Sequence, residues 1–142
     1  MNESEFCAGW NGARKVTVIE HSKNSDTHIF VEAFNYKPHW HAISAAERRT
    51  VIDTVKDTLK ELPKYGVDVL AWGSNAIASE LRAPYDFFCV YAIVGQERFR
   101  LFEESILGSD WCKYFEEVVI GGAAQNPDEL LCEFDRASTE RT

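Results

Sequence analysis

The sequence predicts an α+β fold in which two helices cover one face of a four-stranded antiparallel sheet. Four short apolar segments, rich in β-branched and aromatic residues, are typical of strands. Two longer segments repeat apolar residues at three- and four-residue spacing, as amphipathic helices do. The order is strand, helix, strand, strand, helix, strand. This order is the ferredoxin-like βαββαβ arrangement.

The first predicted strand covers residues 28–36 (HIFVEAFNY). Because side chains alternate across a strand, one face is aliphatic and the other is aromatic with a single acid. The aliphatic face carries Ile29, Val31 and Ala33, and the aromatic face carries Phe30, Glu32 and Phe34. We expect the helices to cover the aliphatic face, and the aromatic face to border a cavity or a second sheet.

The first helix is expected over residues 44–62, where Ser44 and Glu47 form a capping box and Pro63 follows the last turn. The next strands are expected at 67–73 (VDVLAWG) and 86–94 (DFFCVYAIV). The second of these is apolar on both faces and is therefore predicted to be central. Simple alternation places Asp68, Leu70 and Trp72 on one face, opposite Val67, Val69 and Ala71.

The second helix is expected over residues 96–107, followed by a short helical turn capped by Asp110 and a last strand at 117–120. Asn126 and the following proline predict a terminal helix. We expect three parts: an N-terminal arm (1–27) with a possible short strand at 15–20, a barrel domain (28–121), and a C-terminal extension (122–142) with a short helix.

Composition and charge narrow the classes of function. The 142 residues are 45% hydrophobic and 13% aromatic, and the net charge is −8. This acidic balance argues against nucleic acid and anionic membranes as partners. Residues 1–12 are polar and acidic, so we expect no signal peptide; no apolar run is long enough to span a membrane, and the four cysteines show no CxxC spacing. We expect a cytoplasmic protein with reduced thiols, and a lowered pKa for Cys112 at the start of its short helix.

The aromatic face is too apolar to remain in water, and a second copy could cover it sheet to sheet. The segments IFVEAF, ISAAER after Trp40, VDVLAWG, YDFFCVY and WCKYF resemble the dimeric α/β-barrel superfamily, nearest to a group of uncharacterised bacterial barrel proteins. The resemblance covers about residues 29–121. It implies a homodimer with a small-molecule pocket, since the superfamily includes monooxygenases, haem-degrading monooxygenases, polyketide cyclases, isomerases and stress-responsive proteins.

Glu32 is the strongest candidate for chemistry, because a carboxyl group among aromatic side chains is poorly solvated and suits proton transfer. The alternative is a structural ion pair, with Arg82 as one candidate partner. His39 and His41 flank Trp40 in a proline-marked loop. On an extended segment both imidazoles would project to one side, where they could serve acid–base chemistry or hydrogen-bond a substrate. A metal site with Glu32 is the less favoured interpretation.

Tyr91 is a candidate hydrogen-bond donor to a substrate oxygen, and its neighbours are candidate walls for a planar ligand. The predicted substrate-contacting residues are Phe30, Phe34, Trp40, Leu70, Trp72, Phe87 and Cys89. The alternative is that these residues form a dimer core.

The leading hypothesis is a small-molecule-binding dimeric barrel. It could be a cofactor-independent acid–base enzyme of the isomerase, cyclase or monooxygenase type, acting on an aromatic or polyketide-like compound. Glu32 or a loop histidine would move the proton. The alternatives are a non-catalytic binding or stress-response module and a haem-binding or haem-degrading monooxygenase. We expect no resident metal or cofactor under the leading hypothesis.

Overall fold

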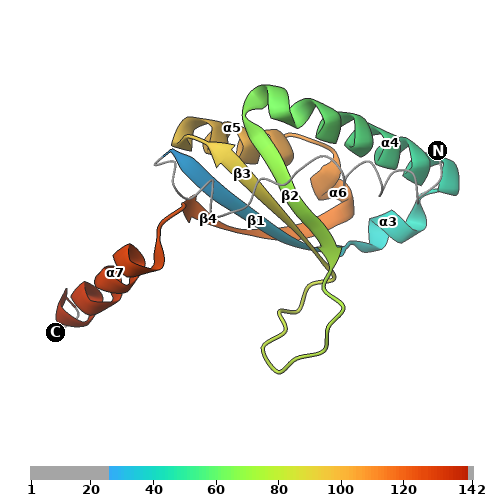
Figure 1. The fold of residues 1–142 in the computed structure, drawn as a ribbon. Coiled ribbons are helices and arrows are strands. Elements are labelled where there is room, and N and C mark those ends of the chain that lie inside the picture. Colours follow the sequence, from blue (N-terminus) through green and yellow to red (C-terminus); the bar gives the residue numbers. More distant parts are fainter. Residues whose placement is uncertain (1–25, 141–142) are drawn as a thin grey trace.

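The computed structural model describes residues 26–140 and shows one four-stranded antiparallel sheet with helices on one face (Figure 1). The strands are β1 (Thr27–Tyr36), β2 (Val67–Ser74), β3 (Phe87–Val94) and β4 (Phe115–Ala123). Their order in the sheet is β2-β3-β1-β4. The predicted βαββαβ order and the central position of β3 are confirmed. Residues 1–25, with the strand expected at 15–20, lie outside the described part.

Two main helices connect the strands, α4 (Ala45–Glu61) and α5 (Gln96–Leu107). Ser44 caps α4 by accepting a hydrogen bond from the Glu47 backbone N–H at 3.1 Å, as its sequence predicts. Shorter elements join them: α3 (Pro38–Ala42), the 3-10 turn η1 (Leu62–Tyr65) and α6 (Trp111–Tyr114). The expected Asp110 cap is wrong, because Ser109 Oγ accepts the Trp111 N–H instead, at 3.2 Å.

The helices cover the aromatic face of the sheet, so the predicted assignment of the two faces was wrong. Phe30 is fully buried and packs against Phe99 and Phe102 of α5, with ring centroids 5.0 Å apart in each pair. On the opposite face, Ile120 is 74% exposed. The alternation of side chains shows which residues share a face, but it does not show which face the helices cover. Packing favours burying the larger aromatic surface against the helices, where other aromatic rings meet it.

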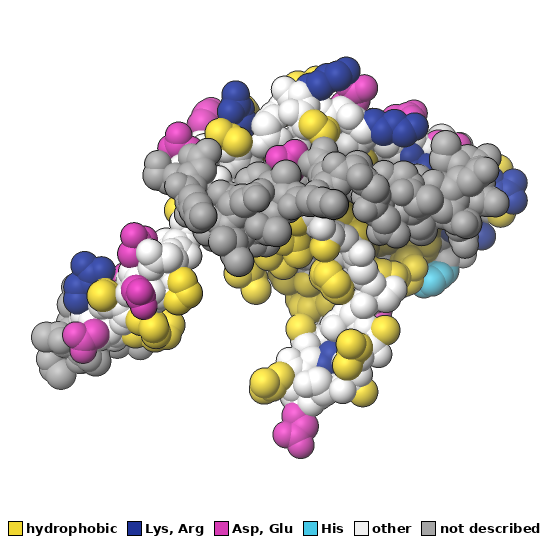
Figure 2. All heavy atoms as spheres, viewed as in Figure 1, with side chains coloured by type: hydrophobic (Ala, Val, Ile, Leu, Met, Phe, Trp, Pro, Cys, Tyr) yellow, Lys and Arg dark blue, Asp and Glu magenta, His cyan; other side chains and the backbone are white. Residues whose placement is uncertain are grey.

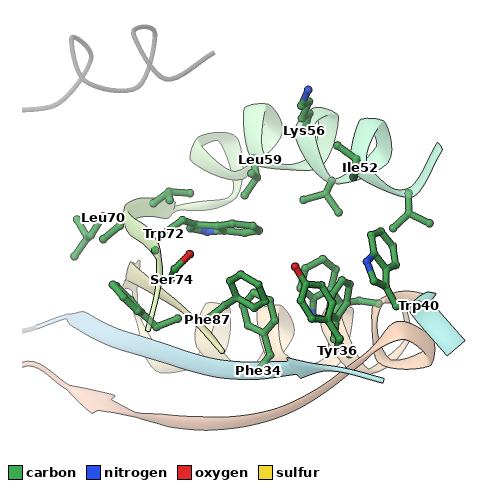
Figure 3. Close-up of a pocket in the computed structure, with 18 residues that line it drawn as sticks. Phe34, Tyr36, Trp40, Ile52, Lys56, Leu59, Leu70, Trp72, Ser74 and Phe87 are labelled. Atoms are coloured by element: carbon green, nitrogen blue, oxygen red, sulfur yellow. The ribbon is translucent and has the colours of Figure 1, made fainter. Parts of the chain in front are cut away.

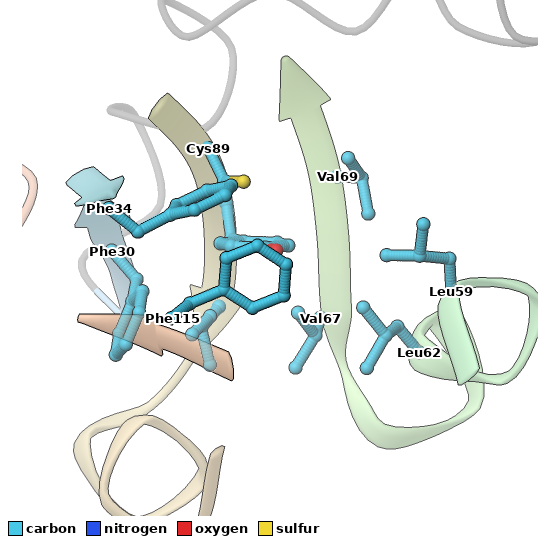
Figure 4. Close-up of a cluster of buried hydrophobic side chains, with 10 residues drawn as sticks. Phe30, Phe34, Leu59, Leu62, Val67, Val69, Cys89 and Phe115 are labelled. Atoms are coloured by element: carbon cyan, nitrogen blue, oxygen red, sulfur yellow. The ribbon is translucent and has the colours of Figure 1, made fainter. Parts of the chain in front are cut away.

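The core therefore lies between the sheet and the helices, and side chains from all four strands contribute to it (Figure 4). Leu59 and Leu62 pack onto Val67 and Val69 at the C-terminal end of α4. The buried core side chains are Phe30, Phe34, Leu59, Leu62, Val67, Val69, Cys89, Tyr91, Ile93 and Phe115.

A bulge in β2 changes which of its side chains face the helices. Val69 pairs with Tyr91 and Ala71 pairs with Val90, so Leu70 is an extra residue between them. Simple alternation would place Trp72 opposite Val69, but the bulge places both on the helix side. The prediction that Trp72 and Tyr91 share a face is confirmed, whereas the prediction that Val67 and Val69 lie on the other face is wrong.

The terminal helix α7 (Pro127–Glu140) extends away from the body (Figure 1). Asn126 Oδ1 caps it by accepting a hydrogen bond from the Glu129 N–H at 3.0 Å. Leu130, Leu131 and Phe134 are exposed along it. In the described part of the chain, no helix has the length and apolar character to span a membrane.

Candidate functional site

A cleft lies between α4 and the sheet, because α4 packs closely only at its C-terminal end. Leu59 is buried there, whereas Val51 and Val55, nearer the N-terminus, line open space. The cleft has two parts that share Trp72 and Trp111 in their walls. We call them the outer hollow, of about 790 Å³, and the inner hollow, of about 430 Å³.

The outer hollow is a largely aromatic space (Figure 3). Phe34, Phe87 and Tyr36 rise from the sheet, and the Trp72 indole lies between β2 and α4. Trp40 of α3 stacks against Tyr36, with centroids 6.4 Å apart and planes 15° apart. Lys56 is the cationic residue of this wall. Flat apolar walls of this kind suit a planar organic molecule.

The inner hollow contains the polar groups. Glu32 of β1 is only 3% exposed, and its Oε1 accepts a hydrogen bond of 2.9 Å from the Tyr91 hydroxyl. The same hydroxyl accepts a hydrogen bond of 3.1 Å from Trp72 Nε1. This chain of donors fixes the Glu32 carboxyl group. Burial and the Glu32 charge also raise the pKa of Tyr91, so the phenol stays protonated.

Two buried polar atoms on residues that line the inner hollow have no hydrogen-bond partner within residues 26–140: Glu32 Oε2 and Trp111 Nε1. One is an acceptor and the other a donor. Buried polar atoms are rarely left in this condition unless a water or a ligand completes them. The residues that carry these two atoms also line the aromatic cleft.

Most predicted wall residues do lie at the cleft. Phe34, Trp40, Leu70 and Phe87 line the outer hollow, Glu32 and Tyr91 line the inner one, and Trp72 lines both. Phe30 and Cys89 are instead fully buried in the core. Burial is the first cause that raises the pKa of the Cys89 thiol, in agreement with the inert thiol that its mid-strand position predicts.

The two loop histidines do not come together, contrary to the geometry expected of an extended segment. They lie on helix α3, where positions two apart point in different directions. His39 stacks on Tyr114 with centroids 5.3 Å apart, and His41 packs against Tyr36 at 5.2 Å. Neither lines a hollow. Within residues 26–140, no group of three or more His, Cys, Asp and Glu side chains is arranged to hold a metal ion.

Two further expectations, on the partner of Arg82 and on the pKa of Cys112, are not met in the structure. Arg82 does not pair with Glu32, because its guanidinium donates to the carbonyls of Asn75, Ala83 and Tyr85 within the β2–β3 loop. The lowered pKa expected of Cys112 is wrong: burial and the neighbouring Glu117 raise it. A four-residue helix cannot offset these two effects.

Two residues that were not predicted belong to this region: Trp111, which lines both hollows, and Glu117, which lies beside Glu32. Trp111 contributes an unpaired indole N–H, and Glu117 has a pKa raised to about 8, by burial first and then by the adjacent Glu32 carboxyl group. The signal for Glu117 was present in the alternation of Phe115, Glu117 and Val119, which places an acid on the same face as buried apolar residues.

The fold and cleft define a ferredoxin-like α+β domain with an aromatic cavity beneath one helix. The chain belongs to a family of unknown function, DUF6616, whose model matches residues 27–136. No curated protein matches the sequence.

Solved structures with a similar fold include chlorite dismutase from Candidatus Nitrospira defluvii. A variant of that protein aligns with a TM-score of 0.61 at 12% identity, covering 78% of this chain and 45% of the other. Its complex with imidazole gives a TM-score of 0.60 at 12% identity, covering 78% and 45%. A variant in complex with cyanide gives 0.59 at 14% identity, covering 79% and 46%. The chain thus spans less than half the length of these proteins, and the likeness shows the fold alone.

Proposed function

We propose that this protein binds a small aromatic or other planar organic molecule in the cleft beneath α4, with one polar group of the ligand in the inner hollow. The observation that carries the proposal is the pair of unpartnered atoms, Glu32 Oε2 and Trp111 Nε1, beside aromatic walls. Glu32 Oε2 can accept a hydrogen bond and Trp111 Nε1 can only donate one, so a hydroxyl group, which does both, is the polar group that we expect in the ligand. Glu32, Glu47 and Asp110 also line the inner hollow, so an anionic head group is disfavoured.

Equilibrium dialysis with three matched probes tests this binding. We expect 2-naphthol to bind about tenfold more tightly than naphthalene, which corresponds to one net hydrogen bond of about 1.4 kcal/mol. The anion 2-naphthoate should bind more weakly than 2-naphthol. The Glu32→Leu variant should lose the preference for the hydroxyl group, whereas Glu116→Leu, on the exposed side of β4, should keep it. Equal binding of 2-naphthol and naphthalene, or no binding of either, contradicts the proposal.

Acid–base catalysis is the chemistry that this arrangement supports for a ligand with an acidic C–H next to a carbonyl group. Glu32 would remove the proton and return it to another carbon, which is an isomerisation. The Tyr91 hydroxyl group already donates its hydrogen bond to Glu32, so Tyr91 positions the carboxyl group. The Trp111 N–H is therefore the better hydrogen-bond donor to the ligand oxygen.

Deuterium exchange into 2-tetralone, followed by NMR, measures this activity. We expect the wild type and Glu116→Gln to accelerate the exchange, and Glu32→Gln to lose the acceleration. Persistence of the activity in Glu32→Gln would rule out Glu32 as the base. Binding of 2-naphthol without any exchange would leave the non-catalytic binding module as the function.

A haem-related function was the third expectation, and the residues of the cleft do not fit it. Among the described residues, no histidine lines either hollow. Tyrosine can also hold haem iron, but as a phenolate. The Tyr91 hydroxyl group donates its proton to Glu32, and its pKa is raised, which is the opposite of what a phenolate ligand requires.

We also include a homodimer in the proposal, formed through the open face of the sheet. Apolar side chains gather there, and hydrophobic surface is visible over the sheet above the β2–β3 loop (Figure 2). The exposed members are Phe88, Val118 and Ile120, with Val31 and Val90 partly buried between them. A two-fold contact of two such faces would bury this surface.

A further inference from the structure

Glu117 lies next to Glu32 on the helix-facing side of the sheet. In the β1–β4 register, Glu117 pairs with Phe34, and Glu32 pairs with Val119. The two acids are therefore diagonal neighbours on one face, a separation that long side chains span. Each has a buried Oε2 atom that accepts no hydrogen bond from another described residue, and a protonated Glu117 can donate to Glu32.

The surroundings of this pair disfavour two negative charges. The groups that act on Glu117 are Glu32 from β1, Cys112 from α6 and Glu103 from α5. The Cys112 thiol lies 3.8 Å from Glu117 Oε1, and the nearby cation Lys37 donates to the Cys112 carbonyl at 2.5 Å. Two neighbouring buried carboxylates, with no cation among the described groups that act on Glu117, ionise one after the other. The raised pKa of Glu117 agrees with this expectation.

We propose that Glu32 and Glu117 share a single proton between β1 and β4, and that Glu117 is a positioning residue that supplies this proton to Glu32 and takes it back. The transfer moves one proton from the Glu117 carboxyl oxygen to the Glu32 carboxylate oxygen, with no other bond broken. Glu32 is nearly inaccessible, whereas Glu117 is only partly buried, so Glu117 can exchange its proton with solvent. The catalytic consequence rests on the proposed function, but the shared proton does not.

Infrared difference spectroscopy of the carboxylic acid C=O stretch, measured without ligand from mildly acidic to mildly alkaline pH, tests the shared proton. In the wild type, we expect one buried carboxylic acid signal that disappears with a midpoint of about 8. In Glu117→Gln this transition should be absent. In Glu32→Gln it should move to lower pH, because the like charge has gone. Glu116→Gln, which changes the neighbouring exposed position of β4, should match the wild type.

An unchanged transition in Glu117→Gln, or an unchanged midpoint in Glu32→Gln, overturns the shared proton. If Glu117→Gln does not fold, the Glu32→Gln result alone decides. In the exchange assay, Glu117→Gln should lower the rate and remove its pH dependence near the same midpoint, whereas Glu116→Gln should keep both; an unaltered pH profile in Glu117→Gln overturns the positioning role. Because the infrared titration needs no ligand, failure of 2-naphthol binding and failure of the shared proton are separate results.

Discussion

Tyr91 donates its hydroxyl proton to Glu32 across two adjacent strands, at 2.9 Å, and the same hydroxyl accepts the Trp72 indole N–H. The contact directs Glu32 Oε1 towards β3 and leaves Oε2 without a partner. A side chain that is only 3% exposed depends on such a donor, because water cannot replace it.

Replacement of Tyr91 by phenylalanine removes this donor with little change in shape. Loss of a buried hydrogen bond to a carboxylate should lower the free energy of unfolding by about 1.5–3 kcal/mol. Urea denaturation measures the change, and Tyr65→Phe is the control because Tyr65 is 67% exposed. Equal stability of the two variants would mean that the Tyr91–Glu32 hydrogen bond contributes nothing to the fold.

The raised pKa of Glu117 predicts how stability depends on pH. In the unfolded chain its pKa is near the ordinary glutamate value of 4.5, and in the folded protein it is about 8. The folded state therefore binds the proton more strongly. The resulting stabilisation is fully present below pH 4.5 and is lost as the pH rises through about 8.

Because Glu117 is only partly buried, solvent screening should reduce this loss to about 1–2 kcal/mol. Urea unfolding at a series of pH values measures it. Glu117→Gln should flatten the decline, and Glu116→Gln should not. A decline of the same size in Glu117→Gln would assign the pH dependence to other groups.

Gly121 allows β4 to pass close to α5. A Cβ atom there would lie 2.6 Å from the Phe99 ring and 2.7 Å from the Ile29 carbonyl oxygen. Gly121→Ala should therefore destabilise the protein by about 1–3 kcal/mol through overpacking. Gly122→Ala is the matched control, since its Cβ would meet nothing within 4 Å. Thermal or urea unfolding compares the two, and equal stability would show that Phe99 moves aside without cost.

The homodimer predicts that a charge on the open face separates the subunits. Ile120→Lys places an ammonium group on the exposed apolar surface, and sedimentation equilibrium should then report a monomer. Leu101→Lys, on the exposed side of α5, should remain dimeric. A wild-type monomer at all concentrations, or a dimer that tolerates Ile120→Lys, would exclude this interface.

The order and type of the elements follow from the sequence because each has strong local signals. Ser44 and Glu47 mark the start of α4, and Asn126 marks the start of α7. Period-two alternation also separates Phe30, Glu32 and Phe34 correctly from their neighbours. Alternation is a local property, however, and does not say which face the helices cover. That choice depends on aromatic residues of α5 and α6 that are distant in sequence.

The sequence correctly predicts those site residues for which a regular strand alone determines the face of the sheet on which the side chain lies. Glu32 and Tyr91 share a face because β1 and β3 are regular and adjacent. The segment expected to be a loop is a short helix that begins at Pro38. The side chains of His39 and His41 therefore point in different directions and not to one side. Trp111 reaches the cleft from α6, a helix too short for its periodicity to indicate which way a side chain points.

The bulge at Leu70 ties the shape of the cleft to the pairing of β2 with β3. Because Leu70 has no partner in β3, Ala71 follows Val69 in the pairing, and the Trp72 indole can donate to the Tyr91 hydroxyl. If Leu70 paired with Val90 instead, strict alternation would turn Trp72 to the opposite face. Both hollows would then lose the Trp72 part of their walls.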